Sequence, residues 1–338
     1  MEQKSVIIIV PCAELNEYVV ECLRGCLRLD YANYRIALLP DAHLELPEEF
    51  RNDAITVMPT GDVTISAKRN LAMSSFPDAA YYAFIDSDAY PQADWLKNGV
   101  GSFFREDIWA VGGPNVTPPN DSLEQKAVGN AARSFLVSGH LAFAKEVSAD
   151  RYCLNLHSCN LIVAAQAIKL VGGFQEELKT GEDRELCHRI RKNGGKIYFR
   201  GSVVVFHHNR HFGRHFFMQR VIHGYSIFSI MKKDKGWSNV VLFIPLIGSI
   251  LIGMGLLVGV VYPLSWIMTA ACIACYVLLT LKEAVRTSNA PSELPLTLAA
   301  IVTSNTGYVL GTILGLLGVK LNFKKMYGNY QPSDRIRT

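Results

Sequence analysis

The charged residues of this 338-residue chain are unevenly distributed, and this divides it into two parts of different character. Charged side chains occur throughout residues 1–235, as in an ordinary globular domain, whereas residues 238–281 and 294–319 contain none. Both charge-free stretches exceed the roughly 20 residues that a helix needs to cross the hydrocarbon core of a bilayer. The sequence therefore predicts a globular part followed by membrane-embedded segments.

Three apolar segments are expected within residues 237–320, at about 238–261, 264–281 and 294–319. The first two are separated by Tyr262 and Pro263, which predicts a hairpin of spanning helices. A short apolar run at the N-terminus lacks the features of a secretory signal, so the globular part is expected in the cytoplasm. Three crossings would then place the basic tail, residues 321–338, outside the cell, against the positive-inside tendency. A re-entrant or hinged third segment, broken near Ser304 and Asn305, is the alternative.

Residues 211–236 are predicted to form an amphipathic helix on the membrane surface, because aromatic residues recur there at three- and four-residue spacing between arginines and histidines. A helix packed on its own domain is the alternative. Gly307, Gly311 and Gly315 lie four apart and allow another helix to approach closely, which suggests a homo-oligomer. The basic residues that flank the apolar segments suit anionic lipids better than nucleic acid.

Strand-like and helical patterns alternate along the first 90 residues, which predicts a doubly wound α/β sheet. The expected strands are residues 6–10, 34–39, 54–58 and 81–85. Asp86 and Asp88 follow the last of these, at the carboxyl edge where open α/β sheets bind ligands. Two carboxylates on one tight turn repel each other unless a cation or a proton lies between them, although they could also simply cap the turn. The first strand lacks a following G-x-G-x-x-G, which argues against a Rossmann dinucleotide site.

The ordered motifs resemble glycosyltransferase family 2, the inverting nucleotide-sugar enzymes of GT-A fold. The matching residues span about 5–230 and are Pro11, Asn16-Glu17, Asp41, Lys68-Arg69-Asn70, Asp86-Ser87-Asp88, Asn160, Gly172-Gly173-Phe174 and Glu182-Asp183. The similarity is to membrane-anchored bacterial exopolysaccharide and lipid-linked oligosaccharide transferases of the inner membrane. It implies a GT-A mixed sheet flanked by helices over residues 1–210. Processive members carry Q-x-x-R-W, whereas here Arg220 directly follows Gln219 without a tryptophan, which favours single addition.

The resemblance implies a divalent cation, Mg²⁺ or Mn²⁺, which neutralises the departing nucleoside diphosphate. Asp88 would bind the metal directly, Asp86 would contact the ribose or a metal-bound water, and His207 or His208 could add an imidazole ligand. A histidine that packs or binds phosphate is the alternative. The donor, by analogy a UDP-sugar, would contact the following residues: Pro11, Glu14, Asp41, Arg69, Asp86 and Asn160. A surface ion pair with a neighbouring acid is the alternative for Arg69.

Family position also assigns Asp183 as the general base and Glu182 as a second acceptor contact. A carboxylate makes an acceptor hydroxyl a competent nucleophile, although acids at a helix start can equally be capping residues. A lipid headgroup on the acceptor would meet Arg210, Arg214, Gln219 and Arg220. The leading hypothesis is transfer of one sugar to a hydroxyl of a lipid-linked or polysaccharide acceptor. Transfer to polyprenyl phosphate, as in dolichyl-phosphate mannose synthases, and an inactive nucleotide-sugar-binding scaffold remain alternatives.

Overall fold

The chain forms two compact units in a computed structural model that describes residues 3–178, 180–233 and 243–321. Unit 1 comprises the described residues of Met1–Pro118 and Phe143–His208, and unit 2 those of Pro119–Ala142 and Asn209–Tyr330. Residues 119–142 were expected within the first domain, 1–210, but they belong to the same compact unit as the C-terminal helices. The predicted tail from residue 322 onward and the segment 234–242 lie outside the described residues.

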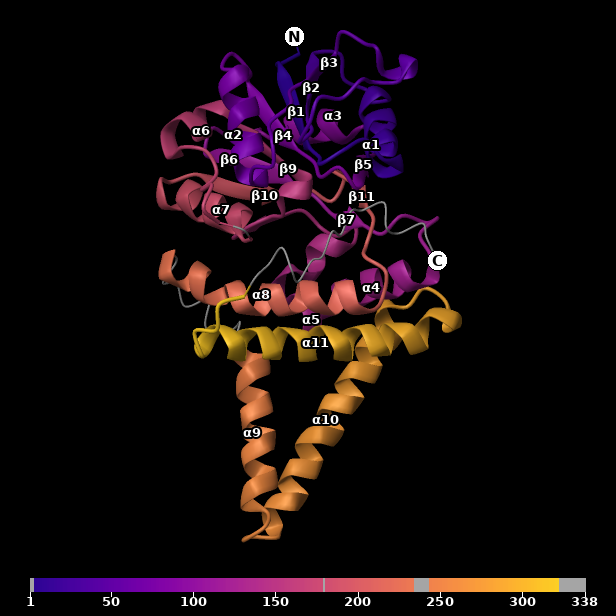
Figure 1. Cartoon of the computed structure of the whole chain (residues 1–338), viewed down its shortest axis with the longest axis vertical. Coiled ribbons are helices and arrows are strands. Elements are labelled where there is room, and N and C mark those ends of the chain that lie inside the picture. The colour runs from indigo at the N-terminus through magenta and orange to yellow at the C-terminus, as the bar shows by residue number, and fades with distance from the viewer. Residues whose placement is uncertain (1–2, 179, 234–242, 322–338) are drawn as a thin grey trace. The chain divides into compact units, whose positions relative to one another are not determined.

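Unit 1 is built on an eight-stranded sheet of order β3-β2-β1-β4-β9-β6-β10-β8, together with a three-stranded sheet of order β5-β11-β7 (Figure 1). The strands are β1 (Val6–Pro11), β2 (Tyr34–Leu39), β3 (Ile55–Val57), β4 (Tyr81–Phe84), β5 (Ala89–Pro91), β6 (Ile108–Gly112), β7 (Asn115–Val116), β8 (Arg151–Cys153), β9 (Leu161–Ala164), β10 (Lys196–Phe199) and β11 (Val205–His207). In the large sheet, β9 runs antiparallel to β4 and β6, and β8 runs antiparallel to β10. The sheet is therefore mixed, and the predicted α/β class is confirmed.

In its described residues, unit 1 has five α-helices, and two of them, α1 and α2, begin with a side-chain cap. The five are α1 (Glu17–Leu27), α2 (Ile65–Ser75), α3 (Trp95–Val100), α6 (Ala165–Val171) and α7 (Glu182–Lys192), with short 3-10 turns at Glu48–Phe50 and Ser158–Asn160 and a further one, Gly139–Lys145, at the junction with unit 2. The Asn16 side chain accepts a hydrogen bond from the Val19 amide at the start of α1, and Thr64 does the same for Ala67 at the start of α2. Both caps satisfy amides that have no partner within the helix.

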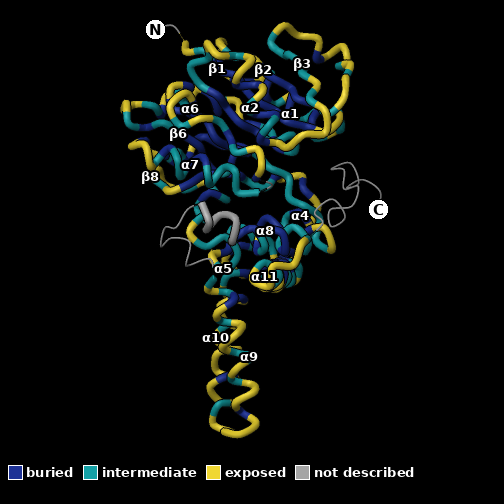
Figure 2. Tube along the Cα trace, turned by 60° about the vertical axis from the view of Figure 1, so that its left-hand side comes forward, coloured by how far each residue is buried: buried dark blue, intermediate teal, exposed yellow. Residues whose placement is uncertain are grey.

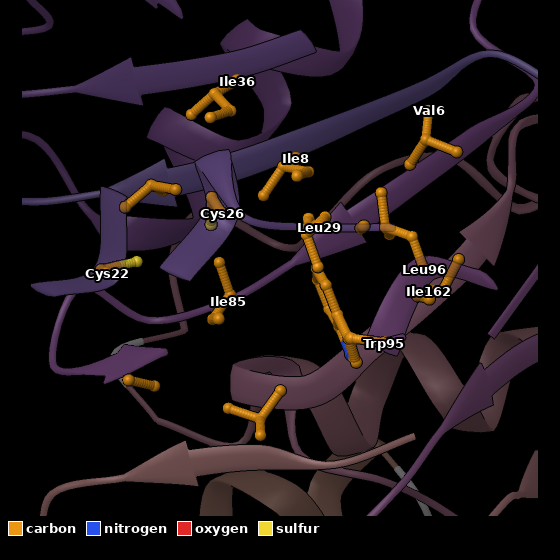
Figure 3. Packing of buried hydrophobic residues seen from close by; sticks show 14 of the residues in the cluster. Val6, Ile8, Cys22, Cys26, Leu29, Ile36, Ile85, Trp95, Leu96 and Ile162 are labelled. Atoms are coloured by element: carbon orange, nitrogen blue, oxygen red, sulfur yellow. The ribbon is translucent and has the colours of Figure 1, made fainter. Parts of the chain in front are cut away.

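Side chains of β1 alternate between two hydrophobic cores, one on each face of the sheet. Val6 and Ile8 join a core with residues of α1 and α3, including the fully buried Trp95 (Figure 3). Ile7 and Ile9 join a second core with residues of α2, α6 and α7. Because both faces are covered, the strand reads as a continuous apolar run in the sequence.

Unit 2 is helical in its described residues. Its helices are α4 (Leu123–Arg133), α5 (Phe135–Ser138), α8 (Arg214–Lys233), α9 (Ile244–Val258), α10 (Leu264–Thr287) and α11 (Leu294–Leu316), with a 3-10 turn at Pro291–Glu293. Helix α4 begins with a reciprocal capping box between Ser122 and Gln125. Helices α8 and α11 run alongside each other, and α9 and α10 form a hairpin that extends from them (Figure 1).

The glycine ladder of α11 contacts α8 of the same chain. A Cβ atom on Gly311 would lie 1.9 Å from the Val221 carbonyl oxygen, and one on Gly307 would lie 3.0 Å from the Phe217 carbonyl oxygen. From the other side, a Cβ on Gly224 would lie 2.0 Å from the Tyr308 carbonyl oxygen. These two ladder positions are therefore used for packing within the chain, and this corrects the expectation that they serve a homo-oligomer.

Two helices of unit 2 are long and apolar enough to cross a membrane, namely Leu264–Thr287 and the continuous helical stretch Pro291–Leu316. Helix α9 is apolar but shorter, at 15 residues. Helix α11 runs through Ser304 and Asn305 without a break, so the hinge considered for the third segment is not present.

We predict that Gly311→Ala destabilises unit 2, because the new methyl group would overlap a backbone carbonyl that cannot rotate away. The expected cost is about 1–3 kcal/mol, typical of overpacking in a closely packed region. Gly253→Ala in α9 is the matched control, since no heavy atom lies within 4 Å of its Cβ position. Thermal unfolding of the detergent-solubilised protein measures both, and equal melting temperatures for the two variants would contradict the close α8–α11 contact.

Candidate active site

Helix α2 carries three consecutive polar residues whose side chains point into unit 1. The first, Lys68, is only 4% exposed and donates hydrogen bonds to the carbonyl oxygens of Cys12, at 2.6 Å, and Leu39, at 3.0 Å. It also donates to a carboxylate oxygen of Asp41. Lys68 thus joins the carboxyl ends of β1 and β2 and fixes Asp41 beside them.

The second residue, Arg69, connects acids from two distant motifs. Its side chain is 1% exposed, and it donates to Asp86 Oδ1 at 2.9 Å and to Glu182 Oε1 at 3.0 Å. The guanidinium also lies 5.1 Å from the centre of the Phe174 ring. Arg69 was expected to face the nucleotide or to form a surface ion pair, and the structure instead shows it buried as the shared counter-charge of the two acids.

The third residue, Asn70, holds the loop of Gly172, Gly173 and Phe174. Its side chain accepts from the Phe174 amide at 2.8 Å and donates to the Phe174 carbonyl at 2.9 Å. A Cβ atom on Gly173 would lie 2.3 Å from Asn70 Oδ1, so this approach requires glycine. From α7, Arg189 donates to the carbonyl oxygens of Gly172 and Gly173. The loop is therefore fastened from both sides.

Glu182 and Asp183 form the first turn of α7. Its N-cap is Gly181, with φ of 77° and no side-chain cap, so neither acid is the N-cap residue. Asp183 accepts from the Arg184 amide at 2.7 Å and from the Ser158 amide at 3.3 Å, and its Oδ2 lies 3.6 Å from His157 Nδ1. The two carboxyls are thus held in different environments.

Those environments move the two pKa values in opposite directions. Burial and the adjacent charge of Asp183 raise the pKa of Glu182 above its usual value, against the opposing effect of Arg69. Burial alone would also raise the pKa of Asp183, but its contact with His157, the hydrogen bond from the Arg184 amide and the charge of Arg69 lower it overall. Asp183 is therefore ionised at neutral pH beside a neighbour that protonates more readily.

His157 is a site residue that the sequence analysis did not identify. The positive charge of Lys145 and burial lower the pKa of its imidazole, although Asp183 acts in the opposite direction. His157 and Cys159 precede β9, which pairs antiparallel with β4 so that Leu161 lies opposite Phe84. Residues before β9 therefore reach the edge where Asp86 follows β4. In the sequence, the apolar run 161–164 indicates a strand. Only its antiparallel direction shows that the residues before it lie beside Asp86.

Asp86, Asp88 and His207 come together at the carboxyl edge of the sheet. Strand β11 pairs antiparallel with β5, which places His207 opposite Ala89, and His207 Nε2 lies 3.1 Å from Asp88 Oδ1. Ligand atoms of Asp86, His207 and Cys159 all lie within 4.8 Å of one another. His208 instead contacts Glu21 at 2.8 Å. Of the two candidate histidines, His207 is thus the one beside the acids.

The donor set of this cluster fits Mg²⁺ or Mn²⁺. Carboxylate oxygens are the ligands that these ions prefer, and an imidazole nitrogen is acceptable to Mn²⁺. Cys159 adds a thiol whose pKa is raised by burial, so it stays protonated and is a poor ligand for a hard cation. Asp86, Asp88 and His207 are therefore the residues that could hold the ion.

The other predicted donor contacts divide into two groups. Pro11 ends β1, and Glu14 is exposed on the following loop, where the Ala13 carbonyl accepts from the Asp41 amide at 3.0 Å. These residues share the edge with the acids. Asn160 differs, because its side chain is 1% exposed and bonds Trp95 and the carbonyls of Pro114 and Val203. It stabilises the core, which corrects its assignment as a donor contact.

The four predicted acceptor contacts, Arg210, Arg214, Gln219 and Arg220, belong to unit 2. Arg214 is exposed at the start of α8. Arg220 lies between α8 and α11, with its guanidinium 5.6 Å from the Tyr308 ring centre and 3.2 Å from His223 Nδ1. Burial lowers the pKa of Arg220 to about 10, so it remains charged at neutral pH.

Comparison with known proteins finds glycosyltransferases, although no family model matches the chain. The pre-mycofactocin glycosyltransferase of Mycobacterium tuberculosis is 27% identical over 145 residues, which cover 43% of this chain and 30% of that protein. The chain thus spans under a third of that relative's length. The dolichyl N-acetyl-alpha-D-glucosaminyl phosphate 3-beta-D-2,3-diacetamido-2,3-dideoxy-beta-D-glucuronosyltransferase of Methanococcus voltae is 22% identical over 259 residues, 70% of this chain and 77% of that one.

A solved structure with a similar fold is the mannosyltransferase PcManGT from Pyrobaculum calidifontis, determined in complex with GDP-Man and Mn²⁺. The TM-score is 0.56 at 16% sequence identity, and the match covers 94% of this chain and 89% of that one. The mixed sheet with flanking helices is therefore a fold of the GT-A-like kind found in sugar transferases.

We predict that Arg69→Met strongly destabilises unit 1, because it leaves Asp86 and Glu182 partly buried without their counter-charge. Breaking a buried ion pair by removing one partner typically costs about 3–5 kcal/mol. Arg24→Met is the matched control, since Arg24 and Glu49 form a pair with about half of each side chain exposed, and little change in melting temperature is expected there. Equal melting temperatures for both variants would show that Arg69 does not hold the two acids.

Proposed function

We propose that this chain is a metal-dependent, inverting glycosyltransferase of the family 2 type, which moves one sugar from a nucleotide-diphosphate donor to a hydroxyl of a lipid-linked or polysaccharide acceptor. The observation that carries the proposal is the Arg69 bridge. It holds an acid of the Asp86–Asp88 turn and an acid of the Glu182–Asp183 pair on one guanidinium, although they lie 96 residues apart in the sequence. The similarity to sugar transferases in sequence and in fold supports the same chemistry.

In this proposal, Asp88, Asp86 and His207 hold Mg²⁺ or Mn²⁺. The ion supplies charge neutralisation for the nucleoside diphosphate that leaves the sugar. Asp86 is oriented for this by Arg69, which occupies its Oδ1 atom. The structure of PcManGT contains Mn²⁺ together with a nucleotide sugar, which supports a donor–metal pair here.

The nucleoside would lie over the ends of β1 and β2, near Pro11, Glu14 and Asp41. Lys68 contacts Asp41 and fixes it in position, so that its carboxylate can accept hydrogen bonds from a base. A UDP-sugar is the proposed donor by family analogy. GDP-sugars should be tested beside it, because the mannosyltransferase of similar fold was determined in complex with GDP-Man.

Asp183 would accept the proton of the acceptor hydroxyl as that oxygen attacks the anomeric carbon in line. An ionised carboxylate is required for this step, and the environment of Asp183 lowers its pKa accordingly. His157 is the positioning residue, because it contacts Asp183 Oδ2 while the Arg184 amide donates to Oδ1. Glu182, held by Arg69, would contact the acceptor beside it.

A lipid-linked acceptor is supported by the dolichyl relative and by the apolar helices of unit 2. Arg210, Arg214, Gln219 and Arg220 would meet the anionic headgroup, since clustered cations favour phosphate. Transfer to polyprenyl phosphate is the competing reaction. Such an acceptor is already ionised and needs no base, so the dependence on Asp183 separates the two.

We predict that Asp183→Asn lowers turnover by about 100-fold or more while donor binding is kept, because the hydroxyl then lacks a proton acceptor. The measurement is transfer from labelled UDP- and GDP-sugars to lipid extract, followed by chromatography of the lipid phase, with donor affinity measured separately. Asp78→Asn, at an exposed carboxyl outside the cluster, should behave as wild type. Undiminished transfer by Asp183→Asn would favour a phosphate acceptor, and a lack of donor binding or transfer by wild type would end the proposal.

We predict that His207→Ala weakens Mn²⁺ binding by about 10-fold or more, because an imidazole beside Asp88 is removed, whereas His208→Ala retains near wild-type affinity. Mn²⁺ paramagnetic resonance titration measures free ion directly and needs no turnover. Asp88→Ala should abolish both Mn²⁺ binding and transfer. Equal losses for the two histidine variants would remove His207 from the metal set.

A further inference from the structure

The two faces of α11 differ in what they contact. One face buries small and polar residues, including Thr297, Ser304 and Thr312, among the helices of unit 2. Asn130 of α4 donates to Thr297 at 3.3 Å and to Glu293 at 2.8 Å. The other face exposes apolar side chains at helical spacing, namely Val302, Leu310, Ile313 and Leu317. Helix α11 is thus packed against protein along one side and is apolar on the other.

The α9–α10 hairpin is exposed along both of its helices (Figure 2), and many of its exposed side chains are apolar. They include Ile247, Leu251, Met254, Ile267, Ile273 and Leu278. Hydroxyl groups point between the helices instead: Ser265 donates to the Gly255 carbonyl at 3.0 Å, and the Thr269 hydroxyl fills the space beside Gly255. Exposing such an apolar surface to water is unfavourable, whereas contact with the acyl chains of a bilayer is not.

The backbone amides in the turn of the hairpin are all hydrogen-bonded within the hairpin. The amides of Gly259, Val260, Val261 and Tyr262 all donate to carbonyls of the last turns of α9, at 2.9–3.2 Å. Pro263 has no amide hydrogen to satisfy. The side chains of Val260, Val261 and Tyr262 are each at least two-thirds exposed, and the turn carries no charge. A turn of this kind can lie at membrane depth, where an unpaired amide would cost several kcal/mol.

The lengths of the helices fit one passage into the bilayer and back. Helix α9 is about 22 Å long and the charge-free part of α10, Leu264–Leu281, about 27 Å, against a hydrocarbon core of about 30 Å. Tyr262 and Trp266, at and just after the turn, are both exposed. At the other end of α10, Glu283 accepts from the Phe135 amide and from Arg286, within the rest of unit 2.

We propose that the α9–α10 hairpin is inserted in a lipid bilayer with its turn inside the membrane, and that α11 lies flat along the bilayer surface. The chain then enters and leaves the membrane on the same side. Lys282, Arg286 and Lys320 then share that side, in agreement with the positive-inside tendency that three crossings would violate. The bilayer contact adds to the proposed function without depending on the transfer chemistry.

The sidedness test uses full-length protein with an epitope tag at each end, in sealed vesicles of both orientations. Both tags should be accessible to antibody from the same face. Accessibility from opposite faces would overturn the proposal, because it requires an odd number of crossings. An inactive protein with both tags on one face would count against the transfer chemistry alone.

The depth test places a cysteine at the turn, Val260→Cys, and treats vesicles of both orientations with a membrane-impermeant maleimide. Labelled peptides are located by mass spectrometry, which separates this site from the native exposed Cys272 and Cys275 on α10. Val260→Cys and both native residues should stay unlabelled from either face and react only after denaturation. Val147→Cys, 66% exposed in unit 1, is the positive control. Labelling of Val260→Cys from the far face would show an emerging loop, and labelling from the Val147 face would show an uninserted hairpin; either result overturns the proposal.

Discussion

The arrangement of the candidate site depends on the buried guanidinium of Arg69. Asp86 and Glu182 each place an oxygen within 3.0 Å of it, and in the sequence Asp183 follows Glu182 directly and Asp88 lies two residues after Asp86. So many carboxylates cannot gather in a partly buried space without positive charge, because each one raises the pKa of its neighbours. Arg69 supplies part of that charge permanently, since arginine does not lose its proton in proteins. Its side chain is itself almost fully buried, so it acts on the cluster through these two acids.

The residues on either side of Arg69 explain why the guanidinium stays in place. Lys68 fixes α2 to the ends of β1 and β2, and Asn70 fixes it to the backbone of Phe174. Phe174 in turn packs against Arg69 and against Phe84, the last residue of β4. A helix secured by three successive side chains cannot rotate without breaking all three sets of contacts. The K-R-N motif therefore holds acids from two distant parts of the chain close together.

The sequence predicted the class of the sheet, the limits of its first strands and the acids at their carboxyl ends. This succeeded because buried parallel strands are continuous apolar runs, and because ligand-binding side chains follow such strands. It placed Arg69 at the nucleotide and Asn160 at the donor, since motif order says which residues are near a site but not which way a side chain points. His157 and Cys159 were missed for a related reason. Their proximity to Asp86 depends on the antiparallel direction of β9, and a four-residue apolar strand carries no signal of direction.

The apolar part of the chain shows where hydropathy and small-residue spacing are ambiguous. A window average over α11 combines a face of small and polar residues with a face of exposed apolar ones, so the helix resembles a membrane span by composition. Glycines four apart permit close approach of a neighbouring helix, yet the spacing is the same whether that helix belongs to the same chain or to another. In this chain the neighbour is α8, whose Gly224 meets Tyr308 while Gly311 meets Val221. Because that reciprocal contact uses the small-residue face, the apolar face of α11 is left outward, which is the arrangement of a helix that lies on a bilayer rather than one that crosses it.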